Sequence, residues 1–427
     1  MVAIALFASL VVFMVFNVPI GIALGVASLV AIGVGDSLSP GYVAQALVTG
    51  CDSFPIMAIP LFILAGELMG AGGVSKRILD VCNVFLGRIT GGLAIVTVVV
   101  CMFFAAVSGS GPATVAAVGS MVVPTMLQRG YSPSFTLALI ACAGSIGVII
   151  PPSIPMVIYG VSTSTSISNL FLAGFVPGLL IGGALIAWCY FYCKKKGWRG
   201  DDTPYSRERA VKALFEAKWA LINPLIILGG IYAGVFTPTE AAAVAAVYAF
   251  VCGVFIHKEL TFKTLVNPIG SACSTTGTTM VILGCATAFT KILTIEQIPA
   301  IITQALIEIT SNGILIMLLI NAMLLVVGCF MDTTPAMIVL SPILLPVALS
   351  VGIDPVHFGL IMVVNLAIGF LTPPLGINLF VATRIGGVPL EVVIRGIGPF
   401  ILVMIVCLML ITYVPAISMC LPNLIGS

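Results

Sequence analysis

Four polar or proline-containing interruptions fall inside otherwise apolar stretches of the sequence. They are SGSGPAT (108–114), GVIIPPS (147–153), MDTTPA (331–336) and GFLTPPLG (369–376). Proline lacks a backbone N–H, so each Pro-Pro pair frees carbonyl oxygens upstream. An unpaired carbonyl in lipid costs several kcal/mol unless another group satisfies it. Because hard cations prefer oxygen ligands, these interruptions predict binding sites for Na⁺.

We predict two Na⁺ sites, each joining one polar interruption to one Pro-Pro interruption. The first joins the side chains of Ser108 and Ser110 to carbonyls around Gly147, Ile150 and Pro152. The second joins Asp332 and Thr334 to carbonyls around Gly369, Thr372 and Pro374. An Asp at the centre of a membrane helix costs roughly 2.5–3.5 kcal/mol, and a cation offsets that cost. The alternative is that the interruptions only kink helices, or that Asp332 caps a half-helix.

Further polar residues lie within or beside apolar stretches. Asn365, Asn378 and Arg384 line the second Pro-Pro segment and are candidates for binding an acidic solute. For Arg384 the alternative is that its side chain only reaches the membrane edge. For Glu67 we expect a hydrogen bond between helices. The segment TPTE (237–240) predicts a helix-capping box.

The composition excludes a soluble protein. Of 427 residues, 60% are hydrophobic and 7% are charged, against about 25% charged in ordinary soluble domains. The formal net charge of +2 comes with no extended basic face, which argues against nucleic acid as a partner. The twelve cysteines include no CxxC pair and are typical of small buried hydrophobes. We find no GxSxG, HExxH or nucleotide-binding loop, so we expect neither an enzyme nor an ATP-driven pump.

The apolar stretches predict an all-α membrane protein with nine spans. We place these spans near 2–34, 54–72, 134–165, 168–193, 219–237, 240–257, 264–290, 356–386 and 393–420. Residues 91–128 and 313–350 each hold two half-length apolar segments around a polar interruption. Each half is short for a crossing, so we predict two re-entrant helical hairpins.

The distribution of Lys and Arg supports this topology. With Met1 in the cytoplasm and both hairpins re-entrant, the basic residues gather on the cytoplasmic side or its edge, and only Lys291 falls outside. This arrangement predicts a multi-pass membrane protein with nine crossings, two hairpins and a C-terminus on the outer side. The polar stretch 194–218 is then a cytoplasmic connector. Residues 2–16 lack a basic start, so we expect a first membrane helix rather than a cleaved signal peptide.

An internal repeat relates the two halves at an offset of 222 residues. Matched pairs include Gly130 with Gly352, Pro133 with Pro355, Ile146-Gly147 with Ile368-Gly369, Pro151-Pro152 with Pro373-Pro374, and Ser110 with Asp332. In the topology above the halves are inverted, an arrangement typical of secondary transporters. Amphipathic stretches precede both hairpins and predict helices lying in the membrane interface, with ordinary loops as the alternative.

These observations divide the chain into seven segments. We expect scaffold helices in 1–74, an interfacial arm in 75–90, a first transport half in 91–165, scaffold helices in 166–290, a second arm in 291–310, a second transport half in 311–388, and a C-terminal scaffold helix in 389–427.

Four stretches resemble the large membrane subunit of tripartite ATP-independent periplasmic (TRAP) transporters. They are FTPTEAAAVAAVYA (236–249), SGSGPATVAAVGS (108–120), GVIIPPSIPMVIYG (147–160) and GFLTPPLGINLFV (369–381). The resemblance covers essentially the whole chain, and FTPTEAAA is its most distinctive motif. It places the family's sodium sites on Ser108, Ser110, Gly147, Pro152, Asp332, Gly369 and Pro374.

The resemblance implies a mechanism and two partners. It implies Na⁺-coupled uptake of an organic acid by an elevator movement of the transport halves. The partners are a periplasmic substrate-binding protein and a small membrane subunit, expected here as a separate chain. Within the family we favour the sialic-acid branch over C4-dicarboxylates. The alternatives are a stand-alone symporter of the same fold and an intramembrane enzyme.

Overall fold

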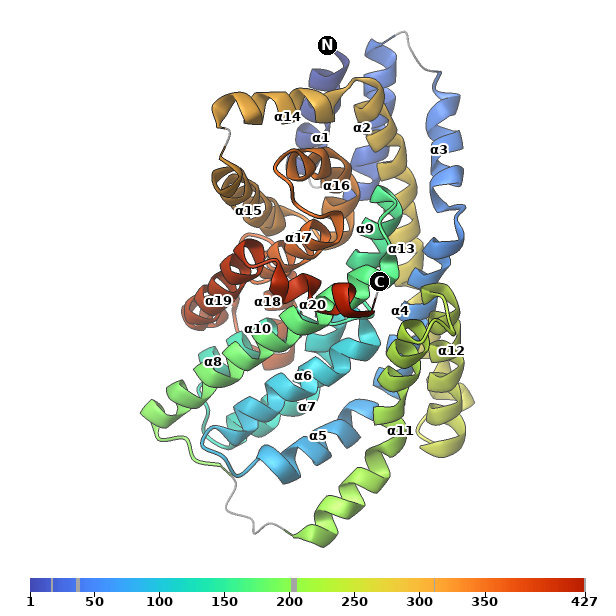
Figure 1. The fold of residues 1–427 in the computed structure, drawn as a ribbon. Coiled ribbons are helices and arrows are strands. Elements are labelled where there is room, and N and C mark those ends of the chain that lie inside the picture. Colours follow the sequence, from blue (N-terminus) through green and yellow to red (C-terminus); the bar gives the residue numbers. More distant parts are fainter. Residues whose placement is uncertain (17, 36–38, 201–205, 311, 426–427) are drawn as a thin grey trace.

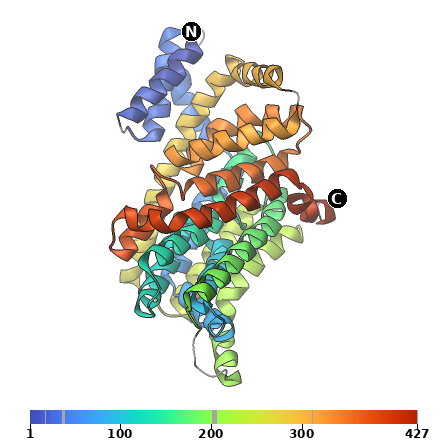
Figure 2. The same ribbon diagram turned by 90° about the vertical axis from the view of Figure 1, so that its left-hand side faces the viewer.

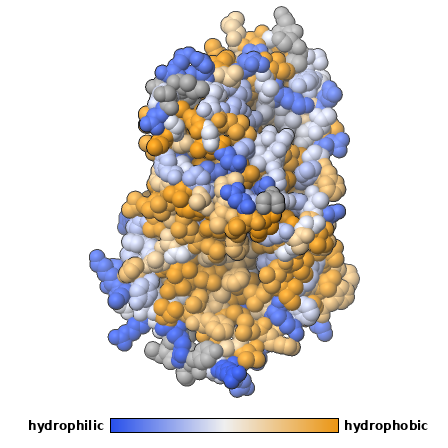
Figure 3. Space-filling model, viewed as in Figure 1, coloured by the Kyte–Doolittle hydropathy of each residue, from blue (hydrophilic) through white to orange (hydrophobic). Residues whose placement is uncertain are grey.

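We describe the protein from a computed structural model, which covers residues 1–427 except 17, 36–38, 201–205, 311 and 426–427. In this described part the chain forms helices joined by turns, without strands (Figure 1). Eight of these helices are long and apolar enough to cross a membrane. Hydrophobic side chains cover much of the lower half of the face seen in Figure 3, with hydrophilic ones along its bottom edge. The expectation of an all-α membrane fold is confirmed.

The N-terminal region differs from the predicted single span over 2–34. It forms two helices, α1 (Val2–Val15) and α2 (Ile20–Val34), which pack against each other. Pro19 is the N-cap of α2, and proline disfavours continuation of a helix through its own position. A further helix, α3 (Gly41–Cys51), was not predicted and packs against a later long helix.

Both predicted hairpins are interrupted at the predicted positions. The first consists of α6 (Gly92–Ser108) and α7 (Gly111–Gln128), and the second of α15 (Gly313–Phe330) and α16 (Thr333–Ser350). The bounds of α7 and α16 differ by the repeat offset of 222 at both ends. The 18-residue α15 and α16 are near the lower limit for a crossing, so their re-entrant path stays a prediction.

Each hairpin is followed by a helix interrupted at its Pro-Pro pair. In the first half, α8 (Pro133–Ser145) and the short η2 (Ile146–Val148) precede the prolines, and α9 (Ile154–Thr163) follows them. In the second half the equivalent helices are α17 (Pro355–Gly369) and α18 (Ile377–Gly386). Gly130 and Gly352 precede α8 and α17 with φ of 81° and 79°. The repeat inferred from sequence is therefore present in the backbone.

The two amphipathic segments form short helices at opposite ends of the molecule. They are α5 (Val74–Leu86) and α14 (Ile298–Ile309), which lie near the bottom and at the top of Figure 1. α5 packs against α6, and α14 packs against α16, so each contacts its own hairpin. The start predicted for the second arm at 291 is too early, because residues 291–295 still belong to the preceding helix.

The remaining helices are mostly long. They are η1 (Phe54–Met57) with α4 (Ala58–Ala71), α10 (Ile167–Lys196), α11 (Arg207–Tyr232), α12 (Pro238–Val251) with η3 (Cys252–Ile256), α13 (Phe262–Ile295), α19 (Leu390–Tyr413) and α20 (Ala416–Ile425). Figure 2 shows α10, α17 and α19 running side by side, and these helices are in contact. The predicted span 393–420 is not continuous, because α19 ends before Val414-Pro415 and α20 begins after them.

The predicted connector 194–218 is shorter than expected. Residues 194–196 finish α10, and α11 already begins at Arg207, where the Ser206 hydroxyl accepts a hydrogen bond from the Arg209 N–H. Residues 201–205 lie outside the described part. The first turns of α11 bury alanines at helical spacing and pack against α5, which is why this charged stretch is helical.

Candidate functional site

The tip of the first hairpin lies directly against the first Pro-Pro interruption. The N–H of Ile154 donates a hydrogen bond to the Gly109 carbonyl at 3.3 Å. A Cβ atom added to Gly109 would lie 2.9 Å from the Pro152 carbonyl oxygen, and one added to Gly147 would lie 2.6 Å from the Ser110 carbonyl oxygen. The structure therefore brings together most of the residues predicted for the first ion site.

Hydroxyl groups surround this contact. Ser108 Oγ lies 2.9 Å from Thr114 Oγ1, and Thr114 Oγ1 donates to the Ser110 carbonyl at 2.8 Å. Ser108 and Thr114 are buried. Sequence analysis did not single out Thr114, although it lies within the SGSGPAT segment, four residues after Ser110. That spacing places it one helical turn from Ser110.

Two contacts limit which oxygens of the first candidate site are available to an ion. The Ser153 hydroxyl donates to the Val148 carbonyl at 2.6 Å, so one of the carbonyls freed by the prolines already has a partner. The side chain of Ile150 packs closely on Gly178 of α10, so only its backbone oxygen could face an ion. The arrangement offers neutral oxygen ligands, which suit a hard cation of low charge.

The second Pro-Pro interruption contacts the second hairpin at the end of α15. Gly328 and Gly369 are in close contact, since a Cβ on Gly328 would lie 3.0 Å from the Gly369 Cα. The Leu375 N–H donates to the Cys329 carbonyl at 3.0 Å, and the Thr372 hydroxyl donates to the Ile368 carbonyl at 3.1 Å. Hairpin and broken helix are thus joined as in the first half.

Asp332 occupies the N-cap of α16. Its carboxylate accepts hydrogen bonds from the Thr333 N–H at 2.6 Å and from the Thr333 hydroxyl at 3.3 Å. Ser110, its repeat partner, likewise caps α7 by accepting from the Ala113 N–H. The capping alternative is therefore present in the structure, and it leaves the carboxylate's other oxygen available to a cation. Thr334 is the second residue of α16 and is buried in its first turn.

The two interruptions differ in exposure. Pro151 and Pro152 are buried, whereas Pro373 and Pro374 are exposed. Because their sequences are related by the repeat, this difference comes from the surrounding helices rather than from the prolines themselves. The second candidate site is the more accessible one in this conformation.

The three residues suggested for solute binding do not converge. Asn365 is fully buried and donates to the Asn321 side chain at 2.8 Å, while Asn321 donates to Thr412 at 3.1 Å. This places Asn365 in a network between helices; Asn321 was missed, although an Asn inside an apolar run signals such a role. Arg384 is exposed in the last turn of α18.

Asn378 is the member of that set closest to a candidate ion site. Its side-chain N–H donates to the Ala141 carbonyl of α8 at 3.0 Å, and its amide nitrogen would lie 3.4 Å from a Cβ on Gly111. Its amide oxygen is buried and has no hydrogen-bond partner among the described residues. Asn378 therefore links the second broken helix to the first hairpin.

A cavity of about 640 Å³ adjoins the first hairpin. It lies between α4, α7 and α13. The Ser271 hydroxyl donates to the Glu67 carboxylate across it at 2.9 Å, which confirms the expected hydrogen bond between helices. Its charged lining residues are Glu67, Lys76 and Glu259.

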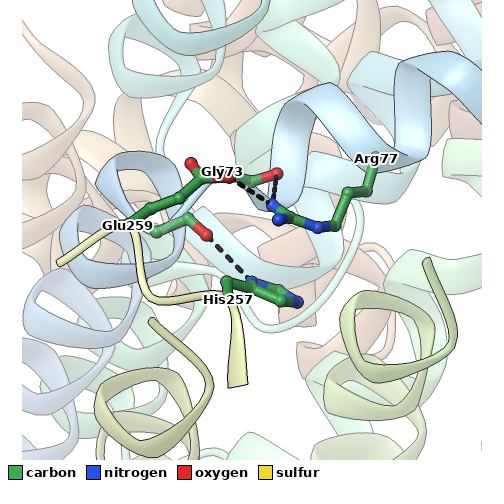
Figure 4. A network of polar contacts seen from close by, with 5 residues as sticks. Gly73, Arg77, His257 and Glu259 are labelled. Carbon is green, nitrogen blue, oxygen red and sulfur yellow. Dashed lines mark hydrogen bonds and ion pairs between the residues drawn. The ribbon is translucent and has the colours of Figure 1, made fainter. Parts of the chain in front are cut away.

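A small polar network forms the rim of this cavity. Arg77 pairs with Glu259 at 2.7 Å and donates to the Gly73 carbonyl, and His257 Nδ1 lies 2.9 Å from the Gly72 carbonyl oxygen (Figure 4). Burial lowers the pKa of His257, and nearby Arg77 lowers it further against the opposing effects of the Gly72 hydrogen bond and of Glu259. The network ties the start of α5 to the turn before α13.

Comparisons with known proteins agree with this architecture. A family model described as "Tripartite ATP-independent periplasmic transporter, DctM component" matches residues 7–417. An isethionate TRAP transporter permease protein of Oleidesulfovibrio alaskensis is 51% identical over 414 residues, which are 97% of this chain and 65% of that protein. The C4-dicarboxylate TRAP transporter large permease protein of Pseudomonas aeruginosa is 43% identical over 88% of each chain.

Two further comparisons bear on substrate and fold. The sialic acid TRAP transporter large permease protein of Vibrio cholerae is 37% identical over 96% of this chain and 95% of that protein. The solved structure of the YdaH transporter from Alcanivorax borkumensis superposes with a TM-score of 0.61 at 15% identity, covering 96% of this chain and 97% of that one. At that identity the likeness supports the fold alone. The relatives are named as permeases, in agreement with the expectation that this chain is not an enzyme.

Proposed function

The chain belongs to the DctM component family of tripartite ATP-independent periplasmic transporters, and on that basis we propose that it imports small organic anions across a bacterial inner membrane in symport with Na⁺. Its expected partners are a small membrane subunit and a periplasmic binding protein that delivers the solute. The binding protein selects the solute, and this chain moves it by an elevator displacement of the two hairpins with their broken helices.

The substrate class rests on chemistry that the relatives share. The named relatives handle isethionate, C4-dicarboxylates and sialic acid, which all carry a carboxylate or sulfonate. The isethionate relative is more similar to this chain than the sialic acid relative, so a preference for sialic acid stays a prediction. A small carboxylate or sulfonate is the proposal that all three relatives support.

One observation carries the proposal of Na⁺ coupling. Two hairpin tips meet two interrupted helices at repeat-related positions, and the first contact gathers the oxygens of Ser108, Ser110 and Thr114 beside Gly147. Two Na⁺ ions moving down a potential of about 100 mV supply roughly 4.6 kcal/mol. A monovalent anion that enters the negative interior takes up about half of this energy, so about 2.3 kcal/mol remains. This corresponds to between one and two decades of accumulation, before the Na⁺ concentration gradient adds to it.

The test is uptake into proteoliposomes that contain this chain with its small subunit, supplied with a solute-loaded binding protein. We expect accumulation of a small carboxylate or sulfonate only when a Na⁺ gradient is imposed. Ser110→Ala and Asp332→Ala abolish the Na⁺-dependent component, because each removes a side-chain oxygen at a hairpin tip. Thr125→Ala, on α7 but far from the tip, is the matched control and keeps normal uptake.

Two results would contradict the proposal. Uptake that proceeds equally without Na⁺ rejects the coupling. Normal Na⁺ dependence in both tip variants, with normal membrane insertion, rejects the site assignment while leaving the transport activity in place. Uptake of free solute by this chain alone identifies a stand-alone symporter instead.

A further inference from the structure

Two adjoining cavities lie at the end of the η1–α4 helix opposite to the cavity described above. Their volumes are about 660 and 280 Å³. Ser53 and Val161 line both of them, so we treat them together as the hydroxyl groove. Its walls come from α3, η1, α12 and α13 on one side, and from α9, the start of α10 and Ile338 of α16 on the other.

The lining of this groove has an unusual composition. Many of its residues carry hydroxyls, among them Thr49, Ser53, Ser162, Ser164, Thr237 and Thr290. Lys291 is the one charged residue among those that line it. The cavity at the other end of α4 has two carboxylates and one lysine instead. The lining residues of the two cavities therefore differ in charge, with one lysine in the groove and a negative balance in the other cavity. Behind the groove, the Glu240 carboxylate is held by hydrogen bonds from the Thr237 N–H and hydroxyl.

Two groups that line the groove lack a hydrogen bond or an ion pair with other described residues. The Ser53 hydroxyl oxygen is buried and has no hydrogen-bond partner within the described residues. Lys291 is exposed, its ammonium lies 5.8 Å from the centre of the Tyr42 ring, and no carboxylate in the described part of the chain pairs with it. A buried, unpaired hydroxyl is unfavourable, and an anion between Ser53 and Lys291 would satisfy both groups.

The position of the groove suits the entry of a solute from the periplasmic side. Lys291 is the only basic residue that the charge distribution places on the periplasmic side. The groove separates helices assigned to the scaffold from α9 and α16, which belong to the transport halves. A solute held there contacts both parts before any movement begins.

We propose that the hydroxyl groove is a capture site for the carboxylate or sulfonate group of a small organic anion, with Lys291 as its charge partner and the hydroxyls of Ser53 and Ser162 as hydrogen-bond donors. This site deepens the proposed function by assigning the anion's first contact on the chain. The acidic cavity at the other end of α4 binds the same anion weakly, which favours release there.

A first experiment measures the charge of the groove without relying on transport. Ser162→Cys is introduced after the exposed Cys273 and Cys420 are replaced by Ser. Its reaction rates in membranes are compared for a sulfonate-bearing and a trimethylammonium-bearing methanethiosulfonate. We expect the anionic reagent to be favoured, and Lys291→Gln to lower the ratio of anionic to cationic rates by roughly tenfold, consistent with Coulomb energies near a surface. Lys291→Arg keeps the ratio.

The matched control places the thiol in the other cavity. Ser120→Cys lines the acidic cavity on α7 and should favour the cationic reagent, with no response to Lys291→Gln. An unchanged rate ratio at position 162 after removal of the Lys291 charge would overturn the capture site, whatever the transport assay shows.

A second experiment ties the groove to uptake. Lys291→Gln should raise the KM for the anion roughly tenfold with kcat nearly unchanged, because the lost contact is made during capture. Lys291→Arg should restore the KM. A fall in kcat alone, or equal effects of both substitutions, contradicts capture. Failure of wild-type protein to respond to Na⁺ rejects the proposed coupling but does not affect the thiol measurement.

Discussion

Thr114 connects the two serines of the first hairpin tip. Its hydroxyl donates to the Ser110 carbonyl and contacts the Ser108 hydroxyl, and it would lie 2.5 Å from a Cβ on Gly147. The side chain therefore sets the spacing of the oxygens proposed to bind Na⁺. A substitution that keeps the shape of the Thr114 side chain but removes its hydroxyl tests whether the hydroxyl contributes to Na⁺ binding.

Thr114→Val provides that change. It leaves the Ser108 hydroxyl with one partner fewer in a buried site, at a cost of about 1–3 kcal/mol. We expect the half-saturating Na⁺ concentration for uptake to rise roughly tenfold, since 1.4 kcal/mol corresponds to a factor of ten. Thr114→Ser retains the hydroxyl and serves as the control. Equal Na⁺ dependence of the two variants would show that the hydroxyl has no part in ion binding.

At the scale of residues, the sequence predicted the contacts at interruptions and the hydrogen bond of Glu67, but it missed the other side-chain contacts within regular helices. Ser108, Ser110 and Gly147 stand at breaks that are visible as polar or proline residues in apolar runs, and the structure brings them together. The partner of Asn365 could not be predicted, because Asn321 lies 44 residues away and their contact depends on helix packing. For the same reason the sequence grouped Asn365 and Arg384 in one candidate solute site, whereas the structure buries Asn365 between helices and exposes Arg384.

At the scale of elements, the junction between α4 and α5 is held by the network of Figure 4. Arg77 and His257 bind the carbonyls of Gly73 and Gly72, where one helix ends and the next begins. Glu259 pairs with Arg77 from the turn before α13. The first arm is therefore fixed to the scaffold by a group that can titrate.

This network predicts a loss of stability in mild acid. Burial lowers the pKa of His257 in the folded protein, while the unfolded chain has a His pKa of about 6.5. The contribution of neutral His257 is present above that value and is lost as the pH falls below it, because the unfolded state then binds more protons. We expect acidification from about pH 7.5 to 5.5 to lower the unfolding temperature more in wild type than in His257→Gln.

Hydrogen exchange provides the complementary measurement. Acidification should increase exchange in α5 of wild type, and this increase should be smaller in His257→Gln, whose side chain can still donate to Gly72 but does not titrate in this range. Identical pH responses of the two proteins would show that His257 does not control the junction.

Element types were predicted better than element ends. The capping box at Thr237 and Glu240 is present as expected, because a cap depends on local sequence alone. The boundary between α1 and α2 and the helix α3 were missed, since a continuous apolar run hides a turn and a short helix is stabilised by packing against α13. The early start of α11 was missed because its charges masked the buried alanines at helical spacing.

At the scale of the whole molecule, the two repeats have related sequences but different packing. By the offset of 222, α4 corresponds to the second half of α13, α6 to α15 and α7 to α16. In the first half, α4 contacts the hairpin mainly through α6, and Gly66 lies against the backbone of Ser108. In the second half, α13 packs on α16, and the Thr290 hydroxyl donates to the Ile338 carbonyl. The two halves therefore pack against their hairpins in different ways in this structure.

Under the proposed elevator mechanism, exchange of these arrangements between the halves would generate the opposite state of the transport cycle. The contact of Gly66 with Ser108, shifted by 222 residues, becomes a contact of Ala288 with Phe330. The present contact of Thr290 with Ile338 must then open. Ala288 and Phe330 lie outside the proposed ion sites and outside the residues that line the groove, whereas Thr290 and Ile338 line the groove. Uptake by the Thr290–Ile338 cysteine pair is therefore measured alongside its cross-linking.

Cross-linking distinguishes the two states. The pair Thr290→Cys with Ile338→Cys should cross-link in the arrangement described here, and the pair Ala288→Cys with Phe330→Cys only in the exchanged one. Na⁺ and solute should change the two yields in opposite directions, because a ligand shifts the population toward the state it binds better. If the second pair never cross-links under any condition in which uptake proceeds, hairpin two does not move along α13 as the repeat requires, and a mechanism with a fixed second hairpin replaces the elevator.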